Sequence, residues 1–220
     1  MVVGSKDDAV TIKAPNLVTC VFKIVGNAPL VVHRFSAKAK NAMLSKMVAG
    51  STAKKGKPRE AFDVQGAFNG ARYVSKEGWD GFNAAAIRAA CISACRLVGF
   101  KMTLAKMSVF VIQDGWDATE PQIPLIRIYG KARVLESVAR VETGQAYVTV
   151  RPCYDEWSAN VKLRFDADQF TLQDVANLLA RVGAQVGICE GRPDSANSAG
   201  QGWGTFDVKT PDEKETANGK

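Results

Sequence analysis

The sequence predicts an α+β fold in which helices pack mainly on one face of an antiparallel sheet. Between Met107 and Phe165, several short runs alternate apolar and polar residues, and Asp-Gly, Gly-Lys and Thr-Gly pairs separate them. This pattern is typical of antiparallel strands joined by tight turns. Helical runs lie before and after these strands rather than between them, which argues against the regular strand-helix alternation of a parallel sheet.

The chain is expected to begin with a flexible arm at residues 1–16, which contain Gly, Ser, Asp and Pro. Residues 17–25 are rich in β-branched side chains and predict a strand. The break at residues 26–29 separates this strand from a second apolar run at residues 30–32. Ser36 is a candidate N-cap for a helix that extends to about Val48.

Positive charge is concentrated after the second apolar run. Eight Lys and Arg residues and no Asp or Glu lie between Arg34 and Arg59; because the whole chain carries a formal charge of +7, the rest carries −1. Residues 51–60 hold no apolar residue beyond Ala53, so a mobile basic loop is expected there. Such a segment is typical of polyanion binding, and a solubilising surface is the alternative.

An alanine-rich run from Phe82 to Val98 predicts a central buried helix, because its apolar residues recur at helical spacing and nearly surround it. A β-rich insertion over residues 106–155 should follow. The predicted strands cover residues 108–113, 124–130, 137–142, 146–152 and 157–165. In the last strand apolar and polar residues alternate strictly, so one face should pack and the other should meet solvent or a ligand.

A final helix is predicted from Thr171, which forms a T-x-x-D capping pattern with Asp174. Gly183 is its expected C-terminal cap. The helix should bury Leu172, Val175, Leu178, Leu179 and Val182. Short strands at residues 185–189 and 205–208 and a disordered tail at 209–220 complete the chain. This order favours a single domain over residues 17–208 with a ferredoxin-like or RRM-like core.

Composition narrows the functional classes. No run approaches eighteen apolar residues and no signal pattern opens the chain, so we expect a cytoplasmic protein without a membrane span. The five cysteines are widely spread and form no CxxC pair, which favours free thiols over disulfides or a metal site. We expect no cofactor.

A glycine-rich loop over residues 187–206 follows the final helix and holds five glycines. Its G-x-G-x-G spacing at Gly200–Gly204, with no following Gly-Lys-Ser/Thr, fits neither dinucleotide nor P-loop binding. Arg192, Trp203 and Phe206 instead offer a cation and stacking faces suited to single-stranded nucleic acid. The alternative is that both aromatics are core residues and the glycines only make a demanding turn.

His33, the only histidine, lies at the end of the second apolar run. It could be a structural residue, a ligand contact or a catalytic group, and the sequence leaves these open. A single histidine cannot form a His-rich metal site, and no serine or cysteine is assigned to it by spacing. An enzyme is therefore poorly supported.

Several motifs resemble a family of proteins encoded by tailed phages and prophages: Pro29-Leu30 with His33-Arg34-Phe35, residues 156–165, residues 177–194 and residues 200–206. The chain departs from that family at Gly191, where an aromatic is expected. In element order and loop character it is more distantly similar to the repeat-associated mysterious protein superfamily, the ferredoxin-like subunits that coat guide RNA in CRISPR effector complexes. That resemblance implies assembly along single-stranded nucleic acid.

The leading hypothesis is a phage-encoded, non-enzymatic protein that binds single-stranded DNA or RNA and self-associates. The predicted contacts are Arg34, Lys38, Lys54, Lys55, Lys57, Arg59, Arg192 and Trp203, with His33 as a further ligand contact. The alternatives are a structural or host-takeover interaction protein and a metal-independent ribonuclease that uses His33.

Overall fold

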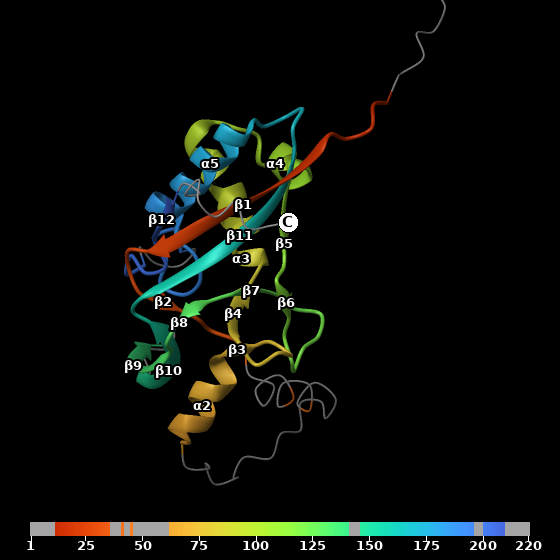
Figure 1. Cartoon of the computed structure of the whole chain (residues 1–220). Coiled ribbons are helices and arrows are strands. Elements are labelled where there is room, and N and C mark those ends of the chain that lie inside the picture. Colours follow the sequence, from red (N-terminus) through yellow and green to blue (C-terminus); the bar gives the residue numbers. More distant parts are fainter. Residues whose placement is uncertain are drawn as a thin grey trace, which may run out of the picture.

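The computed structural model describes residues 12–35, 62–140, 146–195 and 200–209, together with Asn41 and Ser45. It confirms an α+β fold built on antiparallel sheets (Figure 1). The main sheet has the strand order β12-β1-β11-β5, and β8 pairs with the far end of β11. The bounds are β1 Leu17–Gly26, β5 Val109–Ile112, β8 Tyr129–Gly130, β11 Trp157–Asp166 and β12 Phe206–Lys209.

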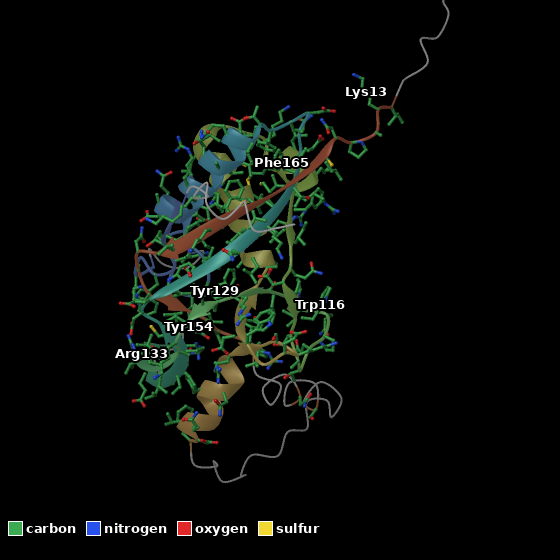
Figure 2. The ribbon with its side chains drawn as sticks, viewed as in Figure 1. Lys13, Trp116, Tyr129, Arg133, Tyr154 and Phe165 are labelled. Atoms are coloured by element: carbon green, nitrogen blue, oxygen red, sulfur yellow. The ribbon has the colours of Figure 1, made fainter. Side chains whose placement is uncertain are left out.

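The two long strands, β1 and β11, form the centre of this sheet. They pair from Leu17 opposite Asp166 to Val25 opposite Ser158. Alternate residues of β11 are buried, as the sequence predicts, and Figure 2 labels one of them, Phe165. The intervening positions are more exposed, so one face of β11 packs against the core and the other faces outward.

Three helices complete the core beside the main sheet: α3 Ala85–Ala94, α4 Met102–Ser108 and α5 Leu172–Arg181. The inward-facing residues of β1 and β11 and the apolar residues of α3 and α5 form one buried cluster. Ile24, Ile87, Leu163 and Leu179 are completely buried in it. Burying one such side chain contributes roughly 1.5–3 kcal/mol, so this cluster fixes the sheet against the helices.

The predicted central helix differs from the observed one at both ends. Residues Asp80–Asn83 form strand β4, so α3 begins only at Ala85. Cys95–Val98 form a 3₁₀ turn, η1, which ends at Gly99 with a left-handed φ of 68°. Val98 is therefore about half exposed rather than buried.

The Thr171–Asp174 capping box of α5 is confirmed, with both reciprocal hydrogen bonds present. Val175, Leu178, Leu179 and Val182 are buried as expected, whereas Leu172 is exposed. Gly183 does not cap the helix. It lies inside a π-helical turn, η2 Val182–Val186, where a Cβ would lie 2.0 Å from the carbonyl oxygen of Phe206. This turn takes the place of the strand predicted at residues 185–189.

Two smaller sheets lie beside the main one (Figure 1). The order β2-β10-β9 joins Leu30–Val31, Ala146–Tyr154 and Arg133–Arg140; Tyr154 and Arg133 are labelled in Figure 2. The order β3-β4-β7-β6 joins Tyr73–Val74, Asp80–Asn83, Pro124–Arg127 and Gly115–Trp116. Helix α2, Val64–Ala71, follows the Asp63 N-cap. The helix predicted to extend to Val48 and the basic loop at 51–60 lie outside the described residues, apart from Asn41 and Ser45.

Candidate nucleic-acid interface

Strand β2 places His33 between two parts of the fold. Val31 pairs with Cys153 of β10, and the next backbone N–H, of Val32, donates to the Pro152 carbonyl at 3.1 Å. One residue beyond His33, the Arg34 N–H donates to the Ala71 carbonyl at the end of α2, at 2.9 Å. The backbone of His33 is thereby held between β10 and α2, although β2 itself is only two residues long.

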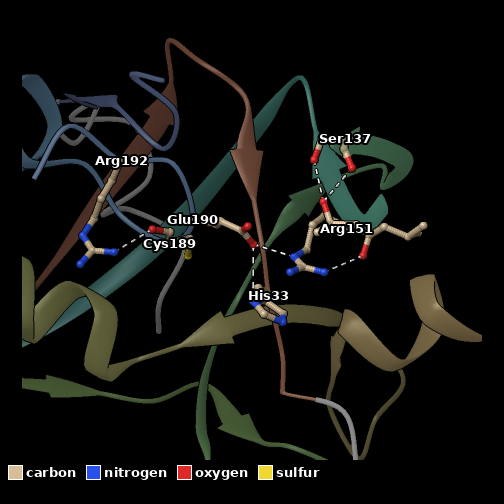
Figure 3. A network of polar contacts seen from close by, with 8 residues as sticks. His33, Ser137, Arg151, Cys189, Glu190 and Arg192 are labelled. Atoms are coloured by element: carbon tan, nitrogen blue, oxygen red, sulfur yellow. Dashed lines mark hydrogen bonds and ion pairs between the residues drawn. The ribbon is translucent and has the colours of Figure 1, made fainter. Parts of the chain in front are cut away.

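The His33 side chain belongs to a charged network (Figure 3). Arg151 donates from Nε to Oε2 of Glu190 at 2.8 Å, and His33 Nδ1 lies 3.6 Å from the same oxygen. Glu190 is brought there by an isolated bridge to Val31, in which its N–H donates to the Val31 carbonyl at 3.0 Å. One carboxylate thus links the histidine to the arginine.

Burial is the main cause that lowers the pKa of His33 below its ordinary value, and the positive charge of Arg151 lowers it further. The Glu190 carboxylate opposes both effects. The lowered pKa favours the neutral form of His33. A neutral imidazole offers one acceptor and one donor nitrogen to a ligand, rather than a positive charge.

The glycine-rich loop folds back onto β2 and the residues before it. Gly204 donates from its N–H to the Pro29 carbonyl at 2.8 Å, and Ile188 donates to the Gly204 carbonyl at 3.0 Å. Gly204 has a φ of 68°, and a Cβ there would lie 2.0 Å from the Ile188 carbonyl oxygen. Gly200 has a φ of 68° and a similar conflict with the Arg192 carbonyl oxygen, at 2.1 Å. These two glycines are therefore required by close backbone packing.

Trp203 and Phe206 have different surroundings. Phe206 is buried and meets Trp157 edge to face, with ring centroids 6.1 Å apart, so it is a core residue. Trp203 is partly exposed, and its ring covers Gly191, where a Cβ would lie 2.4 Å from the indole. An aromatic side chain at position 191 could not fit beside Trp203 in this arrangement.

Arg192 lines a pocket of about 370 Å³ between α3 and the glycine-rich loop, which we call the α3–loop pocket. Its guanidinium donates from Nη1 to the Cys189 carbonyl at 3.0 Å, which fixes the side chain over the loop (Figure 3). His33 and Glu190 line the same pocket. The structure thus brings together two of the predicted contacts, His33 and Arg192.

His33 also lines a second hollow of about 190 Å³, which we call the aromatic pocket. Phe35, Phe62 and Tyr147 line it as well, and each of these three rings is at least 48% exposed. Arg151 completes the lining on the side of Glu190. Exposed aromatic rings gathered beside an arginine form a surface on which a planar ligand can stack.

Arg34 does not have the role that the sequence predicted for it. Its side chain is only 6% exposed and its Nη2 lies 3.3 Å from Oδ1 of Asp117, which is itself 1% exposed. The same Asp117 oxygen accepts the backbone N–H groups of Thr119 and Glu120, at 2.9 and 2.7 Å. Arg34 therefore anchors an internal turn, and it cannot reach a phosphate without leaving this pair.

The remaining predicted phosphate contacts, Lys38, Lys54, Lys55, Lys57 and Arg59, lie outside the described residues. Sequence reasoning missed Glu190, Arg151 and the three rings of the aromatic pocket. Phe35 and Phe62 lie on either side of residues 36–59, which hold seven of the eight clustered cations, and this position was a signal that could have found them. Nothing in the sequence pairs Arg151 with Glu190, which is 39 residues away.

All five cysteines are free thiols, and burial raises the pKa of Cys91 to about 12. Within the described ranges, no group of three His, Cys, Asp or Glu side chains is placed to hold a metal ion. No helix in that part of the chain has the length and apolar character needed to cross a membrane. Comparisons with protein-family models and with curated proteins find no match to this chain.

Proposed function

We propose that the protein binds single-stranded nucleic acid without chemically altering it. Bases stack in the aromatic pocket, and phosphates bind the cationic segment, defined here as residues 36–59. The observation that carries this proposal is the position of Phe35 and Phe62, which line the same pocket. In the sequence Phe35 precedes the seven Lys and Arg residues of the cationic segment, and Phe62 follows them.

This combination of groups favours a single strand over a duplex. A single strand exposes its bases to stacking, and stacking on an aromatic side chain contributes about 1–3 kcal/mol per base. In a duplex the bases are stacked on one another and only phosphates and groove edges are available. The cationic segment supplies the sequence-independent attraction to phosphate, and the rings supply the preference for unpaired bases.

A ferredoxin-like core is part of the proposal. Along the chain, β1, α3, β5, β11, α5 and β12 follow one another as strand, helix, strand, strand, helix, strand. In the sheet the first and third of these strands are central and the fourth lies beside the first. This is the arrangement expected of the ferredoxin-like motif. The smaller sheets are then insertions that carry the aromatic pocket.

The direct test is fluorescence anisotropy with single-stranded and double-stranded DNA and RNA at 50 and 200 mM salt. We expect tightest binding to single strands and an affinity that falls steeply with salt, because several phosphates release counterions. A variant with Gln at Lys54, Lys55, Lys57 and Arg59 should bind more weakly and with a shallower salt slope. Affinity that stays flat across salt, or no binding, refutes the proposal.

We further propose that the protein assembles along the strand. Size-exclusion chromatography with and without an oligonucleotide tests this. Assembly only with the oligonucleotide supports the proposal, whereas assembly without it favours the alternative of an interaction protein. That alternative has one structural feature in its favour, an apolar groove of about 820 Å³ lined in part by Val98, Phe100 and Phe170.

Ribonuclease activity is the third candidate, because His33 is partly exposed and lies in two pockets. Incubation of labelled RNA with the wild type and with His33→Ala decides it. The non-enzymatic proposal expects intact RNA with both proteins, and cleavage that depends on His33 would overturn it.

A further inference from the structure

The α3–loop pocket is lined by apolar and polar side chains, and its polar residues include Ser93 and Asp194 besides Glu190 and Arg192. Small residues of α3 form one wall, and the η2 turn and the start of the glycine-rich loop form the facing wall. These apolar residues are Ala86, Ala89, Ala90, Val186 and Ile188. Its volume of about 370 Å³ is within the range of small-molecule sites. A mostly apolar lining with a few polar groups suits a flat heteroaromatic ring.

The polar groups of this pocket have unused capacity. Both described contacts of the Glu190 carboxylate use Oε2, which leaves Oε1 to accept hydrogen bonds from a ligand. The described contact of Arg192 uses Nη1, and its guanidinium has further N–H donors. A ligand that occupies the pocket therefore meets acceptors at Glu190 and Asp194 and donors at Arg192.

We infer that the α3–loop pocket binds a guanine base of the bound strand, an inference that rests on the proposed function. Guanine carries adjacent N–H donors on its Watson–Crick edge, which suit the Glu190 carboxylate. It carries the O6 and N7 acceptors on its other edge, and arginine is their commonest partner. Adenine carries an N–H₂ donor beside N7 at the position where guanine carries the O6 acceptor. In adenine this donor would therefore face the N–H donors of Arg192 and could not bond to them.

The position of His33 connects this pocket to the proposed strand path. His33 lines both the α3–loop pocket and the aromatic pocket. A strand whose bases stack on Phe35, Phe62 or Tyr147 therefore lies close to the α3–loop pocket, because His33 lines both hollows. One base can leave the stack and enter the α3–loop pocket. Proteins that bind such a flipped base hold it between apolar side chains and form hydrogen bonds with its edge.

The test compares 5′-fluorescein oligo-dT strands of equal length that carry one central dG, dA or abasic position. We expect the dG strand to bind at least about fivefold more tightly than the dA strand, the low end for one bidentate contact. If oligo-dT binds but dG and dA strands bind equally, this inference fails while the proposed function stands. If no strand binds, both fail.

Two variants locate the preference in the pocket. Ala89 is an exposed lining residue on the α3 side of the pocket, so Ala89→Leu narrows the pocket there and should bring the ratio of dG to dA affinity to about one. Ala85→Leu is the matched control, because Ala85 is an exposed alanine of the same helix that does not line this pocket. Glu190→Gln should also reduce the ratio. A guanine preference that survives Ala89→Leu would overturn the inference, since the base would then be read elsewhere.

Discussion

Two glycines of the same loop provide a matched test of the close packing that shapes the α3–loop pocket. Gly202 and Gly204 have similar left-handed φ angles of 75° and 68°. A Cβ at Gly202 would have no neighbour within 4 Å, whereas one at Gly204 would lie 2.0 Å from the Ile188 carbonyl oxygen. Alanine at either position bears the left-handed penalty, and only alanine at Gly204 also forces two backbone segments apart.

The magnitudes follow from these two contributions. A left-handed non-glycine residue costs roughly 1–2 kcal/mol, part of which is offset because alanine also restricts the unfolded chain. Overpacking a closed site costs a further 1–3 kcal/mol or so. Gly204→Ala should therefore be about 1–3 kcal/mol less stable than Gly202→Ala, which corresponds to a Tm roughly 2–12 °C lower in a chain of this size.

Urea unfolding followed by circular dichroism, together with thermal melts of both variants, measures this difference. We expect a lower urea midpoint for Gly204→Ala with an unchanged m-value, since the unfolded chains are alike. If the two variants lose equal stability, within roughly 0.5 kcal/mol, the loop does not depend on the contact between Gly204 and Ile188, and our account of the pocket wall is wrong.

Three further predictions concern single side chains. Arg34→Met should destabilise the fold by about 3–5 kcal/mol in urea unfolding, because it leaves the Asp117 carboxylate buried without its cation. Lys23 is an exposed cation of β1, and an equal loss of stability from Lys23→Met would contradict this prediction. The lowered pKa of His33 means that the folded state binds fewer protons than the unfolded state as the pH falls below about 6.5. The stability that depends on neutral His33 is therefore complete above that pH and is lost progressively below it. Between pH 7 and 5 the wild type should lose more free energy of unfolding than His33→Gln. Parallel plots of this free energy against pH for the two proteins would refute the shift. Thr171→Ala removes the capping box of α5 and should cost about 1 kcal/mol in the same assay, whereas an unchanged urea midpoint would show that the cap contributes nothing.

Features set by local chemistry could be predicted from the sequence. The alternation of β11 follows from five apolar residues at every second position from Trp157 to Phe165. The capping box of α5 depends on two residues three positions apart. The alternation of β11 and the capping box of α5 are both confirmed. Each depends on residues that are close together in the sequence, so no contact with a distant segment is needed to predict it.

Features set by contacts between distant segments could not be predicted. Gly183 has the sequence context of a helix cap, but its real neighbour is Phe206 of β12, which the fold brings against η2. Arg34 lies in a run of cations, yet its partner Asp117 is 83 residues away. Charge counted along the chain cannot distinguish a buried pair from an exposed contact.

The candidate site shows the same division. His33 and Arg192 were recognised from the sequence as a lone histidine and a lone loop cation. Glu190 was not predicted as part of the site. Its carboxylate lies near His33 only because the backbone of Glu190 forms a bridge to Val31. The aromatic pocket likewise requires Tyr147 of β10 to meet residues on both sides of the cationic segment.

The most direct test of the central claim compares Tyr147→Ala with Tyr129→Ala in binding to fluorescein-labelled oligo-dT. The two tyrosines are 48% and 47% exposed, but only Tyr147 lines the aromatic pocket. Loss of one stacking ring at about 1–3 kcal/mol predicts at least about fivefold weaker binding for Tyr147→Ala and little change for Tyr129→Ala. Equal affinities for the two variants would contradict binding at the aromatic pocket.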